Sequence, residues 1–320
     1  MNTKEKFNQL AADITTEIIA ELEKGNIVWE KGFNSISLQS ANNYFSGRVY
    51  EGFNQFYLSY KAQKNNYPTA QYISFKQVQQ LGGYVRKGEK STPVIFWKVS
   101  KYSTCNKSEA GEEEVKKVFT PFIHYVFNVA QVGGIEFKTI KYELSHDNNI
   151  IDTCASIIAQ MSNAPKIKHQ GNQPAYSPIH DVIYMPLIGQ FNNSKFYYQT
   201  LFHELIHSTG HVKRLNRFKD ENNVNSSFGS ESYSKEELTA EMGAAQLCAY
   251  TGILDEKLKE NGAAYLQGWI KALKNDKTLL VSAANKAAKA SKYILNIIKT
   301  GSGGEGQLKM DAPLRYLPFE

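Results

Sequence analysis

A chain of 320 residues is longer than one hydrophobic core usually needs, so its length favours two domains. The composition, 42% hydrophobic and 21% charged, is typical of a folded protein in water, and no run approaches the roughly 20 apolar residues that would cross a bilayer. The opening segment MNTKEKFNQLAAD lacks the apolar core of a secretion signal, and the three cysteines are too far apart for a disulfide framework. We therefore expect a cytoplasmic protein with no membrane contact.

The first half of the chain predicts a helix followed by an α+β region with an antiparallel sheet. Gly25 is expected to end a helix over residues 4–24. The apolar side chains of this segment follow helical spacing: Phe7, Leu10, Ile14, Ile18, Ile19 and Leu22. Between residues 29 and 136, aromatic and β-branched runs such as TPVIFWKVSKY and KKVFTPFIHYVFNVAQV alternate with polar turns, which is typical of strands. The polar segment CNKSEAGEEEVKK between these two runs is expected at the tip of a long hairpin.

The second half predicts a separate, mainly helical domain. Residues 139–149, TIKYELSHDNN, are polar and lack a strong period, which favours a linker. A helix (IIDTCASIIAQMSN) is expected next, and helices dominate from Lys195 onward. The predicted organisation is α+β in two domains, residues 1–138 and 150–300, joined by the linker and followed by an irregular tail over residues 301–320.

The motif HELIHSTGH, residues 203–211, carries the strongest chemical signal. In a helix His203 and His207 share one face, so both imidazoles can reach one metal ion. Glu204 can then act as the general base that takes a proton from an activated water. Two histidines, a third protein ligand and a water are the usual zinc set of a metallopeptidase. The motif therefore predicts one Zn²⁺ per chain, although the same donors also suit Mn²⁺, Co²⁺ or Fe²⁺.

Three residues are candidates for the third ligand. The helix predicted for KEELTAEMGAAQLCAYTGI places Glu237 and Glu241 on one face, and Gly243 indicates close packing against another helix. Glu241 is our first choice, because an unpaired carboxylate among small apolar residues would be costly and a metal would compensate it. Glu237 is the alternative, either as the ligand or as a hydrogen-bond partner of a ligand histidine. His211 ranks last because Gly210 turns the chain off the helix axis.

The segment AYSPIHDVIYMP is expected to form an edge strand whose pairing is limited by Pro178 and Pro186. A peptide substrate could add to such an edge as a further strand, although an ordinary sheet edge accounts for the pattern equally well. Tyr176 and Tyr233 are candidates for stabilising an oxyanion, and packed tyrosines would look the same in the sequence.

The first half also carries an excess of positive charge. From Lys31 to Lys101 there are ten basic residues against two acidic ones, a surplus of eight. Aromatic residues are interleaved with them, and cations combined with exposed rings are typical of sites for single-stranded nucleic acid. Arg86, Lys87 and Lys90 lie in the glycine-bounded loop GYVRKGEKS, which suits phosphate contacts. The loop could instead be an ordinary solvated turn, and the aromatic rings could instead form a buried core.

Five segments together resemble the ArdC-type antirestriction proteins of conjugative plasmids and mobile elements: NYFSGRVYEGFN, GGYVRKGEKSTPVIFWK, YVFNVAQV, FHELIHSTGHVKRLNR and FGSESYSKEELTAEMGAAQLCA. They follow one another in the same order over nearly the whole chain. The resemblance implies an N-terminal single-stranded DNA-binding domain and a C-terminal zincin-like domain similar to the Spartan-type peptidases. It also implies protection of incoming plasmid DNA from host restriction endonucleases.

The resemblance also implies which residues act. By position it points to Asn43, Ser46, Gly47, Arg48, Tyr50, Gly52 and Asn54 for DNA binding and to His203, Glu204, His207, Glu237 and Glu241 for the metal centre. Ser208 stands where relatives often carry tryptophan, a departure that concerns a neighbouring pocket rather than the metal.

Three functions are compatible with these features. The first is an antirestriction protein that binds single-stranded DNA and carries a zinc peptidase. The second is a non-catalytic DNA-binding protein with a structural metal, and the third is a peptidase that acts on DNA-bound or regulatory proteins. Glu204 favours chemistry, because a purely structural metal site needs no general base. The expected partners are single-stranded DNA and a protein substrate or restriction endonuclease.

Overall fold

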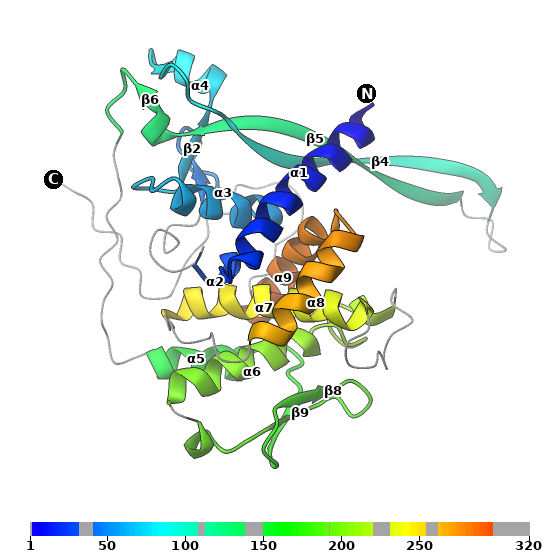
Figure 1. Ribbon diagram of the computed structural model, residues 1–320. Helices are drawn as coiled ribbons and strands as arrows, with labels where there is room; N and C mark the ends of the chain where they lie inside the picture. The colour runs from blue at the N-terminus through cyan, green and yellow to red at the C-terminus, as the bar shows by residue number, and fades with distance from the viewer. Residues whose placement is uncertain are drawn as a thin grey trace.

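The structure is a computed structural model that describes residues 2–31, 41–107, 113–137, 150–191, 193–219, 231–253 and 262–296. Its described part combines helices with three small β-sheets, which is the α+β class expected from the sequence (Figure 1). None of the described helices combines the length and apolar content that crossing a membrane takes. The elements of the first half are α1 (Thr3–Glu23), α2 (Val28–Lys31), β1 (Asn42–Asn43), α3 (Gly52–Lys64), β2 (Gln71–Ser74), α4 (Phe75–Gln80), β3 (Tyr84–Val85), β4 (Thr92–Lys107), β5 (Glu113–Asn128) and β6 (Val132–Gly133).

Helix α1 agrees with the helix predicted over residues 4–24. It begins at a capping box, in which the Asn2 side chain accepts from the Glu5 backbone N–H (2.9 Å) and the Glu5 carboxylate accepts from the Asn2 N–H (2.8 Å). It ends before Gly25, whose positive φ of 78° suits glycine at a helix end. Its apolar face is buried against both halves of the chain.

The main sheet of the first half has the strand order β1-β2-β5-β4. Its pairs β2–β5 and β5–β4 are antiparallel as predicted, whereas the short pair β1–β2 is parallel. Strands β4 and β5 form the long hairpin, which projects from the body of the molecule (Figure 1). The strands extend into the segment expected as the hairpin tip, as far as Lys107 and again from Glu113, and residues 108–112 lie outside the described part.

The second half contains α5 (Ile150–Gln160), β7 (Lys166–His169), β8 (Ala175–Ser177), β9 (Val182–Met185), α6 (Ser194–Ser208), α7 (Glu231–Thr251), α8 (Gly262–Asn275) and α9 (Leu279–Ile294). Its sheet has the order β7-β9-β8, with β8 at an edge. The prediction of one strand over AYSPIHDVIYMP was wrong, because the segment turns at residues 178–181 and forms the two strands β8 and β9. Asp181, at a positive φ of 52°, lies in that turn.

One apolar cluster joins the two halves of the chain. It combines side chains of α1 and α3 with side chains of α7, α8 and α9, and the ring of Trp29 meets that of Trp269 edge-on at 5.2 Å. Length alone suggests a separate core for each domain, whereas this cluster stabilises both halves together. The linker predicted at 139–149 and the tail predicted at 301–320 lie outside the described residues.

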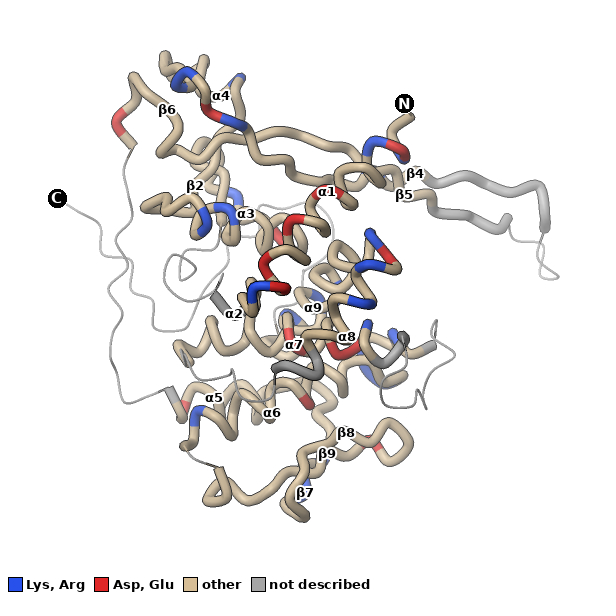
Figure 2. Tube along the Cα trace, viewed as in Figure 1, with Lys and Arg blue, Asp and Glu red and all other residues tan. Residues whose placement is uncertain are grey.

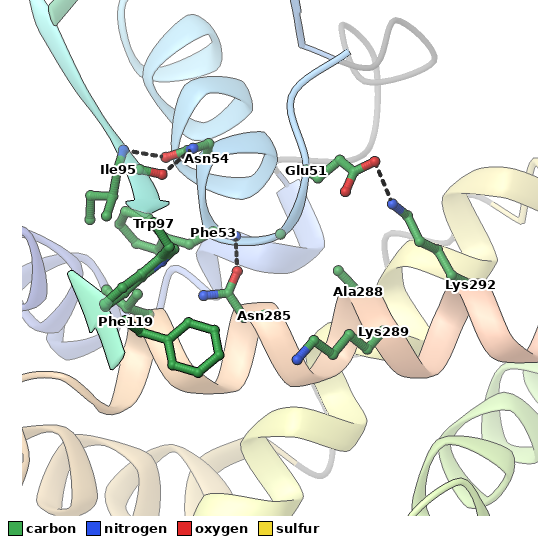
Figure 3. Close-up of a pocket in the computed structure, with 12 residues that line it drawn as sticks. Glu51, Phe53, Asn54, Ile95, Trp97, Phe119, Asn285, Ala288, Lys289 and Lys292 are labelled. Carbon is green, nitrogen blue, oxygen red and sulfur yellow. Dashed lines mark hydrogen bonds and ion pairs between the residues drawn. The ribbon is translucent and has the colours of Figure 1, made fainter. Parts of the chain in front are cut away.

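The start of α3 is fixed between the long hairpin and α9 (Figure 3). The Asn285 side chain of α9 accepts from the backbone N–H of Phe53 at 3.0 Å. Gly52 has a positive φ of 57°, and a Cβ atom there would lie 2.1 Å from the Asn285 Oδ1 atom. On the other side, the amide of Asn54 binds the carbonyl and N–H of Ile95 at 2.7 and 2.8 Å. The contacts of Asn54 hold α3 to β4, and the contact of Asn285 connects α3 to α9.

Gly52→Ala is therefore expected to destabilise the protein at this junction. The positive φ costs about 1–2 kcal/mol for a residue with a Cβ, and overpacking against Asn285 adds about 1–3 kcal/mol. Unfolding by denaturant measures the total loss in the free energy of unfolding. Gly25→Ala is the matched control, because Gly25 has a positive φ of 78° but nothing within 4 Å of its Cβ position. Equal losses in the two variants would show that the contact with Asn285 carries no strain.

Candidate metal centre and nucleic-acid interface

Helix α6 presents the two histidines of the motif on one face. It begins at Asn193, whose side chain accepts from the Phe196 backbone N–H at 2.8 Å, and its apolar side chains are buried in the second half. His203 and His207 are one turn apart, and their Nε2 atoms lie 3.0 Å from each other. Two imidazole nitrogens at this separation converge on one point, as a shared cation requires.

Helix α7 supplies a carboxylate to the same point. The two oxygens of Glu237 lie 3.3 Å from His203 Nε2 and 3.4 Å from His207 Nε2. Glu241, one turn further along α7, reaches the other ring nitrogen of His203, Nδ1, at 3.3 Å. The helices can approach this closely because Gly243 has no side chain, and a Cβ there would lie 2.6 Å from Ile206. The geometry thus favours Glu237 over our first choice, Glu241, as the third donor.

The spacing of these donor atoms suits one shared divalent metal ion. Bonds of about 2.0–2.1 Å at tetrahedral angles place two donors about 3.3–3.4 Å apart. The two Nε2 atoms lie 3.0 Å apart, and one oxygen of Glu237 lies 3.3 Å from His203 Nε2 while its other oxygen lies 3.4 Å from His207 Nε2. Among the described residues, these three form the one such group whose donor atoms all lie within 4.8 Å of one another. Two imidazoles and one carboxylate are a donor set that can hold such an ion.

Carboxylates also hold the outward nitrogens of both imidazoles. Glu236 lies 3.2 Å from His207 Nδ1 and is itself bound by the Arg217 Nε atom at 3.1 Å. Glu241 holds the same position on His203. A carboxylate on Nδ1 fixes the ring orientation and raises the basicity of Nε2 toward a metal. Both histidines are therefore oriented for binding through Nε2.

Glu204 points toward the edge strand β8. Its side chain is buried, and one carboxylate oxygen accepts from the backbone N–H of Tyr176 at 2.7 Å. Strand β8 is fixed in turn, because the Tyr176 hydroxyl donates to Asp181 (2.9 Å) and accepts from Arg214 (3.0 Å). The side chain of Arg214 is fully buried and pairs with Asp181. Its links to Tyr176 and Asp181 hold the strand that positions the Glu204 carboxylate.

The remaining candidates of the second half lie outside the three-donor group. His211, ranked last as a ligand, has its Nδ1 atom 3.8 Å from Asp181. Of the two tyrosines considered for an oxyanion, Tyr176 has its hydroxyl engaged by Asp181 and Arg214. The side chain of Tyr233 is outside the described part of the chain. Ser208 is fully buried, and its hydroxyl donates to the carbonyl of Leu205 at 2.7 Å.

The carboxylates around the imidazoles control their charge. Burial opposes protonation, but the hydrogen bonds to Glu236 and Glu237 outweigh it and raise the pKa of His207 to about 9. The pKa of His203 is also raised, because Glu241 and Glu237 outweigh its burial. Burial acts against ionisation of Glu237, yet its two histidine partners lower the pKa of this carboxyl. A cluster that binds protons this strongly presents a site for a divalent cation.

In the first half, the structure places three of the predicted DNA-binding residues in the interior, namely Tyr50, Gly52 and Asn54. Asn54 is buried, and both atoms of its amide bind the backbone of Ile95. Tyr50 is 9% exposed and belongs to an apolar cluster. Their placement favours a structural contribution by both side chains.

The other predicted DNA-binding residues are accessible. Asn43 shapes its loop by accepting from the backbone and hydroxyl of Ser46 at 3.0 Å, and Ser46 and Arg48 are exposed. In the second loop Arg86, Lys87 and Lys90 are exposed, and Arg86 donates to the Ala130 carbonyl at 3.0 Å. Figure 2 shows basic segments beside α4 and on α3.

Comparisons with known proteins match each half of the chain to a different family. Residues 8–127 match the N-terminal domain of the anti-restriction factor ArdC. Residues 154–286 match a zincin-like metallopeptidase family, and this range contains both histidines of α6 and the glutamates of α7.

Two solved structures resemble the chain over almost its full length. The metal-free crystal structure of the antirestriction protein ArdC from plasmid R388 has a TM-score of 0.67 and 32% identity, over 89% of this chain and 96% of that one. The chain belongs to the ArdC antirestriction family. The Mn(II)-bound crystal structure of the same R388 protein has a TM-score of 0.66 and 30% identity, over 90% of this chain and 97% of that one. ArdC of R388 thus binds a divalent metal.

Relatives of this ArdC-family chain include longer proteins. A DNA primase TraC of Escherichia coli is 32% identical over 308 residues, which is 92% of this chain but 20% of the primase. An uncharacterized protein of Sinorhizobium fredii is 28% identical over 288 residues, 88% of this chain and 90% of that protein. The chain therefore spans about a fifth of the TraC primase, and the activity of the whole primase is not carried over.

Several residues around the metal centre of this ArdC-family chain are not apparent in the sequence. Glu236, Arg217, Asp181 and Arg214 lie outside the HELIHSTGH motif, and each contacts a motif residue or Tyr176. One signal was available, because Glu236 directly precedes Glu237 on a helix already expected to pack against the motif. The arginines gave no such signal, since a basic residue after a helix end usually lies on the surface.

The raised histidine pKa values predict that the stability of metal-free and zinc-loaded protein depends differently on pH. A charged His207 contributes stability that is fully present below its ordinary pKa of 6.5 and is lost as the pH rises through about 9. Metal-free protein should therefore lose up to about 3 kcal/mol of stability between these pH values. Zinc-loaded protein should not, since deprotonation favours metal binding. Thermal unfolding with chelator or with zinc, across this pH range, measures how the stability of each form depends on pH. Equal slopes of stability against pH would contradict the assignment of His203 and His207 as metal ligands.

Proposed function

We propose that this chain is an antirestriction protein that binds single-stranded DNA and uses a zinc-dependent peptidase centre to protect incoming mobile-element DNA from host restriction. One observation carries the peptidase part. A buried glutamate, Glu204, directly follows one of two imidazoles that converge with Glu237 on a single point. Membership of the ArdC antirestriction family supports the protective role.

In this proposal His203, His207 and Glu237 hold the zinc ion. Glu241 and Glu236 bind the outward nitrogens of the two imidazoles and orient them. The same three donors accept Mn²⁺ or another divalent transition metal, and zinc is proposed because two histidines, a third protein ligand and a water are the usual zinc set of a peptidase centre.

The chemistry is hydrolysis of a peptide bond. The metal, when bound, supplies positive charge that polarises a peptide carbonyl and favours deprotonation of water. Glu204 takes a proton from the attacking water as the new C–O bond forms, and it delivers this proton to the nitrogen as the C–N bond breaks. The N–H of Tyr176 holds the carboxylate between these two transfers. Among the described strands β8 lies at an edge of its sheet, and an extended peptide substrate can pair beside it.

The DNA-binding part of the proposal rests on the exposed basic residues of the first half. Ser46, Arg48, Arg86, Lys87 and Lys90 are accessible and can contact phosphates. Asn43, Tyr50 and Asn54 act indirectly, by holding the loop and helix beside them. We assign DNA binding mainly to residues 1–138 and peptidase chemistry to residues 150–300, and we expect both in the cytoplasm, where incoming DNA meets restriction enzymes.

Survival of unmodified plasmid DNA tests the proposal. The plasmid is introduced into a restricting host that expresses the chain and into the same host with an empty vector. We expect more transformants with the chain present. An isogenic host that lacks the restriction endonuclease is the control, in which the chain should have no effect. Equal survival with and without the chain in the restricting host would overturn the antirestriction role.

A further inference from the structure

A cavity of about 550 Å³ opens between the two halves of the chain. Its volume falls within the roughly 300–1,000 Å³ that is usual for ligand sites. The first turn of α3 and the hairpin of β4 and β5 form one side, and α9 forms the other (Figure 3). None of the residues that line it belongs to the metal centre. The cavity is therefore a separate site, made by both halves of the molecule.

Two aromatic rings of the hairpin are accessible at this cavity. Trp97 is 43% exposed and Phe119 is 59% exposed. Trp97 pairs with Pro121 and Phe119 pairs with Val99, so the two rings share one face of the hairpin. The ring of Phe7 in α1 meets Trp97 edge-on at 5.3 Å and holds it in place. Large, oriented and accessible rings of this kind are stacking surfaces for another flat group.

The opposite side of the cavity is positively charged. Helix α9 contributes Lys289 and Lys292, four and seven residues after Asn285 on the same side of the helix. Lys292 pairs with Glu51 at 2.7 Å, so these two charges offset each other. Within the described part of the chain, Lys289 has no carboxylate partner. The positive end of α3, which the Glu51 side chain does not cap, also lines the cavity. The unbalanced charge is therefore positive and favours an anion.

We propose that this cavity holds a nucleotide of single-stranded DNA, with the base on Trp97 and Phe119 and a phosphate on Lys289. Accessible rings beside cations are how proteins bind single strands without reading their sequence. The inference rests on the proposed DNA-binding function and adds the path of the strand. DNA crosses the junction between the halves and contacts α9, so α9 contributes to DNA binding beside residues 1–138.

Tryptophan fluorescence tests this placement directly. The chain has three tryptophans, and two of them, Trp29 and Trp269, are buried against each other. Trp97 is thus the one accessible reporter. Full-length, zinc-loaded protein is titrated with oligo-dT longer than the roughly 4–16 nucleotides that one single-strand module covers. We expect quenching by oligo-dT and much weaker quenching by an abasic oligonucleotide of equal length, which has the phosphates but no bases.

Substitutions separate stacking from charge. Trp97→Ala and Phe119→Ala should each weaken oligo-dT binding about tenfold, as loss of one stacked base does. Phe119 is exposed enough that its removal should leave the fold intact. Lys289→Glu should weaken binding and reduce the salt dependence. Lys271→Glu is the matched control, because Lys271 is exposed on α8, outside the cavity lining, and the charge change is the same.

Three results would overturn the inference, and they differ in what else they affect. In the first, oligo-dT binds without quenching Trp97 and with an affinity that Phe119→Ala and Lys289→Glu leave unchanged. In that case the DNA lies elsewhere on the protein, and the DNA-binding function itself stands. If oligo-dT does not bind at low salt, both the cavity assignment and the DNA-binding function fail. If poly-glutamate quenches Trp97 and oligo-dT does not, the cavity binds an acidic protein segment instead.

Discussion

Glutamine in place of Glu204 is expected to reduce plasmid protection to the level of an empty vector while metal content stays at the wild-type value. Removal of a general base slows proton transfer by about 10²- to 10⁴-fold. Glutamine has the same shape, and its amide oxygen can still accept from the Tyr176 N–H that holds Glu204 at 2.7 Å. The fold and the three metal donors should therefore persist. Plasmid survival, bound zinc per chain and the melting temperature are measured together.

Glu23→Gln is the control for this substitution. Glu23 is half exposed and pairs with Lys274 on the surface, away from the metal centre, so its loss should change none of the three measurements. A Glu204→Gln protein that binds zinc and DNA yet protects fully would contradict hydrolysis as the mechanism. Protection would then come from occupation of DNA or of an endonuclease, which is the non-catalytic alternative.

The sequence was sufficient to predict the helical histidine pair, because the spacing of four residues places both rings on one face of any helix. The sequence was also sufficient to predict that a second helix, which carries carboxylates, packs against the helix of the histidines, because Gly243 and its small neighbours allow a close approach. It could not rank Glu237 against Glu241. Both lie on the same face of α7, and the choice depends on the axial offset between α6 and α7, which is set by contacts such as Ile206 on Gly243.

The fold class was predictable from local patterns, whereas the way the halves pack was not. Helical spacing in α1 and the aromatic runs of β4 and β5 are local signals, and both elements are present. The shared cluster around Trp29 and Trp269 joins residues far apart in the sequence, which no periodicity encodes. Asn54 illustrates the same limit, since its position in a family motif suggested DNA contact and its amide instead binds Ile95.

A pair of matched substitutions on α7 should identify the third metal ligand. Glu237→Gln removes the carboxylate that lies 3.3 and 3.4 Å from the two Nε2 atoms, and we expect zinc affinity to fall by more than 100-fold. Glu241→Gln removes a partner of the outward His203 nitrogen, and such orienting contacts account for about 10- to 100-fold in metal affinity. Competition with a chelator of known affinity measures both losses at one pH.

The two variants are each other's control, because the substitution, the helix and the change in charge are the same and only the imidazole nitrogens they face differ. A larger loss in Glu237→Gln assigns Glu237 to the metal and Glu241 to orientation of His203. The opposite order would require α7 to shift so that Glu241 faces the Nε2 atoms when zinc binds, and it would restore our original choice. In that case metal binding would reposition α7, and the changed α6–α7 packing would appear as a zinc-dependent protection of α7 amides in hydrogen exchange.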